Sequence, residues 1–268
     1  MKVLLTNDDG IEADGLQTLR RALLALPGIS LGVVAPDGNR SAMARSITTR
    51  RPLWVEEIDF GDGTVGYATD GTPVDCVRLA NLGLIPDWAP EMVVSGINHG
   101  TNIGDDITYS GTVAAALEGV ILGVPAIAVS QQSSKLELDF SPPSAFEFTA
   151  AAAFTARLVA DLASVPLAPG TLLNVNFPGC EPEGITVARL GRRYYQDELQ
   201  VVEEASAVRR RYHVYGEAVE PALDDAGSDV AALAARHVTL TPLHFDLTHH
   251  DGVAALAGHD LQRLLRES

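Results

Sequence analysis

Short apolar runs alternate along this chain with stretches of helical periodicity, and this alternation restricts its fold more than any other feature. Residues 2–6 form the first apolar run and residues 31–35 the second. Between them, leucines recur at helical spacing from residue 16 to residue 26. A strand, a helix and a strand in this order, with strands that are apolar throughout, predict a parallel sheet covered by helices on both faces.

The same alternation continues beyond residue 70. It predicts further strands at 91–95, 126–130, 171–177, 185–190 and 237–243, and helices at 73–81, from about 112, at 144–164 and from about 252. We therefore expect a three-layer α/β sandwich with a mainly parallel sheet. Residues 192–220 carry charged and aromatic side chains without helical periodicity, which indicates a projecting hairpin or arm.

The charge and the cysteines exclude several classes of function. Lys and Arg number 19 against 35 Asp and Glu, and a net charge of -16 argues against duplex nucleic acid or an anionic membrane as partner. An acidic protein can still bind a phosphorylated small molecule where a metal ion, a helix N-terminus or an arginine supplies local positive potential. Cys76 and Cys180 lie far apart, and no apolar stretch reaches the roughly 20 residues of a membrane span. We expect a soluble cytoplasmic protein.

Two adjacent carboxylates follow the first predicted strand, in the string NDDG. Asp8 and Asp9 would repel each other there unless a cation or a shared proton compensates them, and Gly10 allows the turn that brings both to one point. A DDG string alone is most often only a turn. Its position at the end of a core strand favours a site for a hard divalent ion, Mg²⁺ or Mn²⁺.

Two later loops offer neutral oxygen ligands for the same ion. Ser41 follows the second predicted strand and Asn98 follows the strand at 91–95. The carboxyl ends of parallel strands meet at one edge of a sheet, so we expect these side chains to converge on Asp8 and Asp9. We place His99 outside the site, because a single loop histidine is more often solvated or a hydrogen-bond partner.

A phosphate site is indicated by Ser110, Gly111 and Thr112, which precede an alanine-rich helix. Small residues at a helix N-terminus let backbone N–H groups reach an anion, although Ser and Thr are also ordinary N-caps. The chain has neither GxxxxGK[ST] nor a GxGxxG string after the first strand, which disfavours P-loop hydrolysis and ordinary dinucleotide binding.

The strings LLTNDDG, APDGNRS, SGINHGTNIGDDITYSGTVAAALEG and TPLHFDLTHH, in this order and spacing, closely resemble the SurE (survival protein E) family of metal-dependent 5'-nucleotidases. The resemblance covers nearly the whole chain, although 192–220 matches only in general character. It implies a Rossmann-like catalytic core at 1–190. Residues 191–268 would then be an arm, a returning strand and a C-terminal oligomerisation segment, or the whole chain would be a single domain over 1–268.

The resemblance also implies roles for individual residues. One divalent cation per subunit, Mg²⁺ or Mn²⁺, is expected on four ligands: Asp8, Asp9, Ser41 and Asn98. Phosphate contacts are expected from four further residues: Asn102, Ser110, Gly111 and Thr112. Asp8 and Asp9 are the catalytic candidates, as general base or as nucleophile. The expected substrates are nucleoside 5'-monophosphates, with 3'-monophosphates and polyphosphate as further candidates, and the expected assembly is a homodimer or homotetramer that exchanges C-terminal segments.

Two other functions remain open from the residues alone. A haloacid-dehalogenase-type phosphatase also ends a strand with a DxDG motif, but Asn7 stands where its nucleophilic Asp would be. A noncatalytic nucleotide- or metal-binding stress protein would use the same contacts for binding alone. In the arm, Tyr194, Tyr195 and residues 209–211 could contact a base or a phosphate, although a subunit contact is more typical of such a segment. His249 to Asp251 are expected to form a polar turn.

Overall fold

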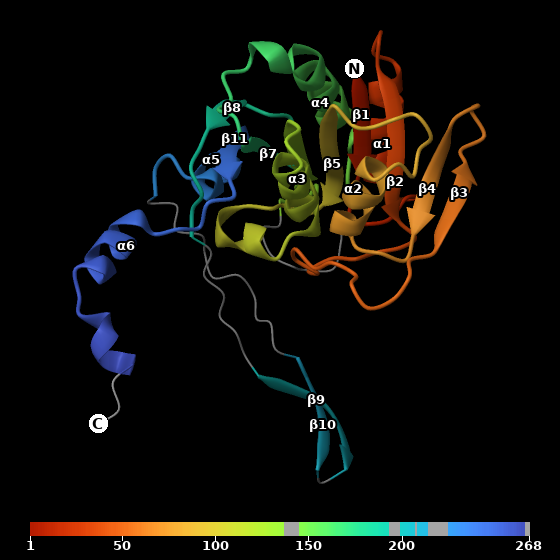
Figure 1. Cartoon of the computed structure of the whole chain (residues 1–268). Coiled ribbons are helices and arrows are strands. Elements are labelled where there is room, and N and C mark those ends of the chain that lie inside the picture. The colour runs from red at the N-terminus through yellow and green to blue at the C-terminus, as the bar shows by residue number, and fades with distance from the viewer. Residues whose placement is uncertain (137–144, 193–198, 207, 214–224, 266–268) are drawn as a thin grey trace.

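The central sheet is mainly parallel, as the apolar runs predict. The computed structural model describes residues 1–136, 145–192, 199–206, 208–213 and 225–265. Within them, strands form one sheet in the order β3-β4-β2-β1-β5-β6-β7-β11-β8 (Figure 1). The parallel centre consists of β1 (Lys2–Thr6), β2 (Ser30–Pro36), β5 (Met92–His99), β6 (Ala126–Gln131) and β7 (Thr171–Phe177). The carboxyl ends of these strands therefore meet at one edge of the sheet.

The two flanks of the sheet contain antiparallel pairs. On one side β3 (Val55–Asp59) runs antiparallel to β4 (Val65–Thr69), which is parallel to β2. On the other side β11 (His237–His244) runs antiparallel to β7 and parallel to β8 (Gly184–Val187). The sheet thus incorporates a strand that comes after the arm.

Helices cover both faces of the sheet, which confirms the three-layer sandwich. On one face lie α1 (Asp14–Leu24) and α4 (Thr149–Asp161), and on the other lie α2 (Pro73–Asn81) and α3 (Gly111–Ile121). The leucines at α1 positions 16, 19 and 23 are fully buried, as helical spacing requires for a face that packs on a sheet. Thr72 and Asp75 form a capping box that starts α2 at Pro73.

Some elements differ from the expectations. We did not predict β3, β4 or α5 (Asp229–Ala234). The strand β3 reads VEEID and lies at the edge of the sheet without a buried residue, so it lacks the apolar run of a central strand. Helix α4 begins at Thr149 rather than at 144, and residue 144 itself lies outside the described residues.

The end of the chain is also more regular than predicted. Helix α6 (His250–Ala257) begins at His250, inside the expected polar turn. Short 3-10 helices complete the described elements: η1 (Gly104–Thr108), η2 (Leu162–Ser164) and η3 (Leu261–Leu265).

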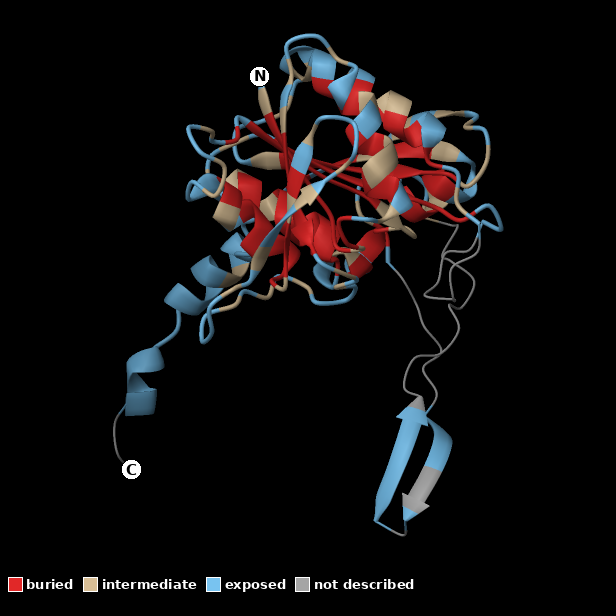
Figure 2. Ribbon diagram, turned by 90° about the vertical axis from the view of Figure 1, so that its right-hand side faces the viewer, coloured by how far each residue is buried: buried red, intermediate tan, exposed pale blue. Residues whose placement is uncertain are grey.

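The predicted arm contains an antiparallel hairpin, β9 (Gln200–Ser206) with β10 (Arg209–His213). It is separate from the main sheet (Figure 1). Figure 2 shows that its described residues, like α6 and η3, are mostly exposed. Tyr194 and Tyr195, and the rest of the arm at 193, 196–198, 207 and 214–220, lie outside the described residues. No helix in the described ranges is both long and apolar enough to cross a bilayer.

Candidate active site

A tight turn at the carboxyl end of β1 carries the two predicted carboxylates. The Asn7 amide donates to the Gly10 carbonyl at 2.9 Å, and the Gly10 N–H donates to Asn7 Oδ1 at 3.2 Å. Gly10 has a φ of +111°, and a Cβ there would lie 3.1 Å from the Gly38 Cα. Glycine is therefore required both by the backbone conformation and by the close approach of the next loop.

Asp8 lies against the first turn of α3. Its side chain is buried, and its Oδ1 accepts a hydrogen bond of 2.5 Å from Thr112 Oγ1. A Cβ on Gly111 would lie 2.8 Å from Asp8 Oδ2, so a glycine is needed for this approach. A predicted metal ligand and a predicted phosphate-binding turn are thus in direct contact.

The electrostatics of Asp8 and Asp9 favour a bound cation. Burial, and then the neighbouring Asp9 carboxylate, raise the pKa of Asp8 to about 7, although the hydrogen bond from Thr112 opposes the shift. The guanidinium of Arg40 pairs with Asp37 at 2.5 Å, while its backbone N–H donates to the Asp8 carbonyl at 2.6 Å. A divalent ion would offset the repulsion between the two carboxylates.

Asp9 links the two other predicted ligand loops. Its Oδ2 accepts from the His99 N–H at 3.0 Å, directly after Asn98 at the end of β5. Its Oδ1 accepts from Asn39 Nδ2 at 3.4 Å, and Asn39 Oδ1 in turn accepts from the Ser41 N–H at 2.9 Å. The loops that carry Ser41 and Asn98 are therefore connected to Asp9 through adjacent residues.

The loop after β2 is also anchored to the helices. Glu118 of α3 is fully buried and accepts from Arg45 Nη2 at 2.6 Å and from Arg78 Nη1 of α2 at 2.9 Å. Ala44, beside Arg45, donates its N–H to the Tyr109 carbonyl at 3.0 Å. These bonds hold the segment that follows Ser41 against the start of α3.

The donor set suits a hard cation. The four predicted ligands would supply two carboxylates, a hydroxyl and an amide oxygen, and the two carboxylates would balance the charge of a divalent ion. The Asn98 amide nitrogen donates to the Gly100 carbonyl at 2.9 Å, which fixes the orientation of the amide. Within the described ranges no group of three or more His, Cys, Asp or Glu forms a metal site, so a cation here would depend on the neutral oxygens as well.

The predicted phosphate residues have structural partners of their own. Ser110 Oγ caps α3 by accepting from the Val113 N–H at 3.0 Å, and the Thr112 hydroxyl is bound to Asp8. Asn102 is buried, and its Nδ2 donates to Ser130 Oγ at 2.8 Å. The Thr112 backbone also donates a hydrogen bond that lowers the pKa of Asp8, so the start of α3 offers an anion the positive end of the helix dipole beside a carboxylate.

Comparison with known proteins decides the family. The family model described as "Survival protein SurE" matches residues 3–197. The chain belongs to the SurE family. It is 50% identical over 268 residues to the 5'-nucleotidase SurE of Rubrobacter xylanophilus, covering 99% of each chain, and 42% identical to that of Desulforudis audaxviator, covering 96% of each. The crystal structure of the SurE protein from Aquifex aeolicus matches with a TM-score of 0.79 and 34% identity, covering 99% of this chain and 100% of that one.

Two asparagines that the sequence analysis does not single out fix the loop that carries Asn102 in this SurE-family chain. Asn176 Oδ1 accepts from the Asn102 N–H at 2.8 Å, and the Asn102 carbonyl accepts from Asn174 Nδ2 at 2.8 Å and Asn176 Nδ2 at 2.9 Å. Both asparagines lie on β7 with fully buried side chains. The NVN string in an otherwise apolar strand could have indicated this pair, because alternate residues of a strand point to the same face.

Asp229, at the start of α5, also binds the loop that carries Asn102 in this SurE-family chain. Its Oδ2 accepts from the Gly104 N–H at 2.9 Å, and its Oδ1 accepts from the Gly191 N–H at 2.8 Å. Burial raises the pKa of Asp229, and these backbone N–H groups oppose the shift. No sequence motif pointed to this residue, since its partners lie 125 and 38 positions away.

His99, which the sequence leaves outside the predicted site, contacts the predicted metal ligand Asp9. Its ring Nδ1 lies 2.9 Å from Asp9 Oδ2. Burial by itself lowers the pKa of His99, but the hydrogen bond and charge of Asp9 outweigh it, so the pKa is raised. His99 is therefore a hydrogen-bond partner, as expected of a single loop histidine, and the residue that it contacts, Asp9, is a predicted metal ligand.

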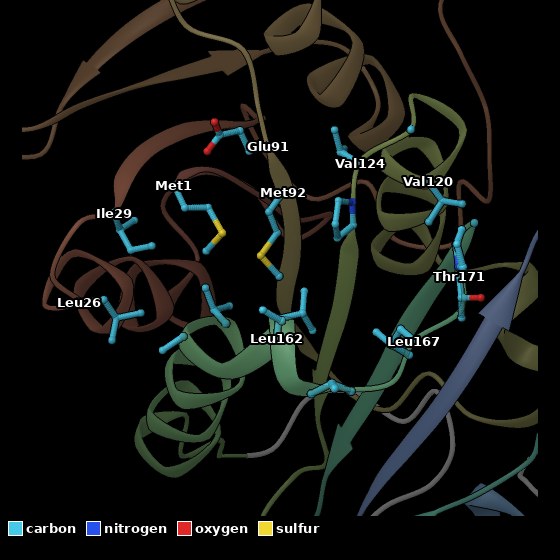
Figure 3. A pocket seen from close by; sticks show the side chains of 18 of the residues that line it. Met1, Leu26, Ile29, Glu91, Met92, Val120, Val124, Leu162, Leu167 and Thr171 are labelled. Atoms are coloured by element: carbon cyan, nitrogen blue, oxygen red, sulfur yellow. The ribbon is translucent and has the colours of Figure 1, made fainter.

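A cavity of about 1090 Å³ lies elsewhere, at the amino ends of the parallel strands (Figure 3). Met1 before β1, Met92 at the start of β5 and Thr171 at the start of β7 line it. Asp8, Asp9 and Asn98 are at the carboxyl ends of their strands, so this cavity is separate from the candidate active site.

Proposed function

We propose that this chain is a metal-dependent phosphomonoesterase that hydrolyses nucleoside 5'-monophosphates to nucleoside and phosphate. The observation that carries the proposal is the direct contact of Asp8 with Gly111 and Thr112, which puts an anion-binding helix N-terminus beside paired carboxylates. The relatives named 5'-nucleotidase SurE support this reaction and this class of substrate.

We assign the cation to Asp8, Asp9, Ser41 and Asn98, with one Mg²⁺ or Mn²⁺ per subunit. When bound, such an ion polarises a phosphoryl oxygen and lowers the pKa of coordinated water. The two carboxylates then no longer repel each other. The positive charge of the ion explains how a protein with a net charge of -16 can bind a phosphate group.

The protein itself orients the phosphate. The start of α3 at Gly111 and Thr112 lies against Asp8, and the helix dipole there favours negative charge that develops in the transition state. Asn102, Ser110 and the loop between them complete the phosphate side. Asp8 and Asp9 are the catalytic candidates, either as general base toward water or as nucleophile.

The direct test is phosphate release from 5'-AMP, 3'-AMP and inorganic polyphosphate with Mn²⁺ or Mg²⁺, repeated in EDTA. We expect release from 5'-AMP that stops in EDTA and returns with added metal. Failure of every phosphomonoester to release phosphate in a metal-dependent way would overturn the proposal. Tight binding of Mn²⁺ and AMP without turnover would instead support a noncatalytic nucleotide- or metal-binding stress protein.

The haloacid-dehalogenase-type mechanism is disfavoured. Its nucleophile would have to occupy position 7, where the Asn7 side chain instead makes two hydrogen bonds to Gly10. An amide in a turn-stabilising role is not a nucleophile.

We further propose that the chain is a cytoplasmic homodimer or homotetramer, in which residues 1–190 are the catalytic core and residues 191–268 the oligomerisation segment of one SurE-like domain. Large apolar side chains of β9, α6 and η3 are exposed in the single chain (Figure 2). Examples are Val202 of β9, Leu256 of α6, and Leu264 and Leu265 of η3. A partner subunit would bury them. Light scattering that gives a monomer at micromolar concentration would contradict this assembly.

A further inference from the structure

His99 places two hydrogen-bond donors on one oxygen of Asp9. The backbone N–H lies 3.0 Å from Asp9 Oδ2, and the ring Nδ1 lies 2.9 Å from the same atom. An ionised carboxylate only accepts hydrogen bonds, so the ring nitrogen must be the donor. Two donors on Oδ2 fix the rotation of the carboxylate. They leave Oδ1, which accepts a longer bond of 3.4 Å from Asn39, as the oxygen available to a cation.

Two aromatic rings hold the imidazole in turn. The His99 ring meets Phe148 edge-on with centroids 4.9 Å apart, and meets Phe146 edge-on at 5.2 Å. The two phenylalanines stack on each other at 5.6 Å with an interplanar angle of 10°. Phe148 is buried at the start of α4, so the imidazole is positioned by the helix layer of the fold rather than by its loop alone.

We propose that His99 is a positioning residue that orients Asp9 for the divalent cation through its Nδ1–H. The inference rests on the proposed metal site and adds to it a specific donor atom and the aromatic pair that aims it. Carboxylate ligands in metal sites depend on such hydrogen bonds, and removal of the partner typically weakens metal binding about 10- to 100-fold. The histidine does not need to touch the substrate.

The test compares three substitutions that differ in where they place a donor. His99→Asn puts an amide N–H near the position of Nδ1, His99→Gln puts it farther out, and His99→Ala has none. The exposed His259→Ala serves as the matched control. The Mn²⁺ dissociation constant is measured by titration calorimetry and by electron paramagnetic resonance of free Mn²⁺, without nucleotide. We expect His99→Ala and His99→Gln to weaken binding about 10- to 100-fold and His99→Asn to stay within about threefold of the unmodified protein.

Two outcomes would overturn the inference. One is wild-type Mn²⁺ affinity in His99→Ala, and the other is equal weakening in all three His99 variants, which would assign the effect to ring packing. Thermal unfolding in EDTA identifies any variant that fails to fold, and His99→Gln, which retains bulk, then replaces His99→Ala. If the unmodified protein does not bind Mn²⁺, the proposed metal site itself fails. Normal binding by the unmodified protein with unaffected variants removes only the role of His99.

Discussion

Thr112 Oγ1 donates a 2.5 Å hydrogen bond to Asp8 Oδ1 across 104 positions of sequence. The bond commits the threonine hydroxyl to the carboxylate. It also favours the charged form of Asp8, which is the form that binds a cation.

Thr112→Val should therefore weaken metal binding with little change of shape. Loss of the hydrogen bond raises the pKa of Asp8 further above about 7, so more of the carboxyl is protonated at neutral pH. We expect roughly a tenfold loss of Mn²⁺ affinity at pH 7, measured by titration calorimetry. Thr112→Ser retains the hydroxyl and should bind Mn²⁺ like the unmodified protein. Equal affinity in the Val and Ser variants would contradict this role.

The metal-free protein should lose stability as pH rises. Asp8 has a pKa of about 7 in the folded protein, above its ordinary value of 3.8, so its contribution to stability is fully present below pH 3.8 and is lost as pH rises through 7. For the same reason protons compete with the metal, and Mn²⁺ affinity should increase with pH up to about 7 and then level off. Chemical unfolding in EDTA and calorimetry across this range measure the two effects. Asp8→Asn should remove the part of each slope that this group causes.

Asp8→Asn should separate activity from stability. The amide keeps the shape but removes a ligand charge, so metal-dependent phosphate release should fall roughly 100-fold or more. The metal-free variant should be at least as stable as the unmodified protein at pH 8, because a buried charge next to Asp9 has been removed. Activity near the wild-type level at limiting Mn²⁺ would remove Asp8 from the site.

Gly111→Ala should disrupt the site sterically. The new Cβ would lie 2.8 Å from both Asp8 Cβ and Oδ2, so the carboxylate or the helix start must move. Misplacement of about 1 Å at a reacting centre can cost on the order of 100-fold in rate, and kcat/KM for 5'-AMP measures it. Gly258→Ala, where the nearest atom would be 3.5 Å away, is the control and should be neutral. Unchanged kinetics in Gly111→Ala would contradict the packing.

Asn176→Ala should weaken substrate binding without changing metal binding. It leaves the Asn102 N–H without its partner and takes one of the two donors from its carbonyl, a cost of roughly 1–3 kcal/mol for the buried N–H. We expect KM for 5'-AMP to rise while the Mn²⁺ dissociation constant stays the same, and steady-state kinetics with calorimetry measures both. A parallel loss of metal affinity would show that the two halves of the site are not independent. Ser164→Ala, on the exposed surface, controls for nonspecific effects.

The sequence predicted the elements whose residues carry their own signal. Strand β7 was predicted at its observed bounds, because the largely apolar run TLLNVNF lies between two Pro-Gly pairs, at 169–170 and 178–179. The capping box at Thr72 likewise marked the start of α2 locally. By contrast, β3 has the charge pattern of a surface segment and becomes a strand only because β4 offers it an edge.

The candidate site divides in the same way. The NDDG and SGT strings identified Asp8 and Thr112 separately, but their hydrogen bond depends on how α3 crosses the end of β1. The contacts of His99 with Asp9 and with the rings of Phe146 and Phe148 cannot be inferred from neighbouring residues in the sequence. Contacts between side chains that are far apart in the sequence cannot be predicted from a single sequence.

Asp229 gives the arm a defined relation to the rest of the chain. It accepts hydrogen bonds from Gly191, just before the arm, and from Gly104, in the loop that carries Asn102. Arg189 and Asp225, on either side of the arm, also pair, with Arg189 Nη1 at 2.9 Å from Asp225 Oδ2. The segments before and after the arm are thus held together at the core by these bonds. A change in the length or composition of the hairpin therefore need not move Gly104 or the neighbouring Asn102.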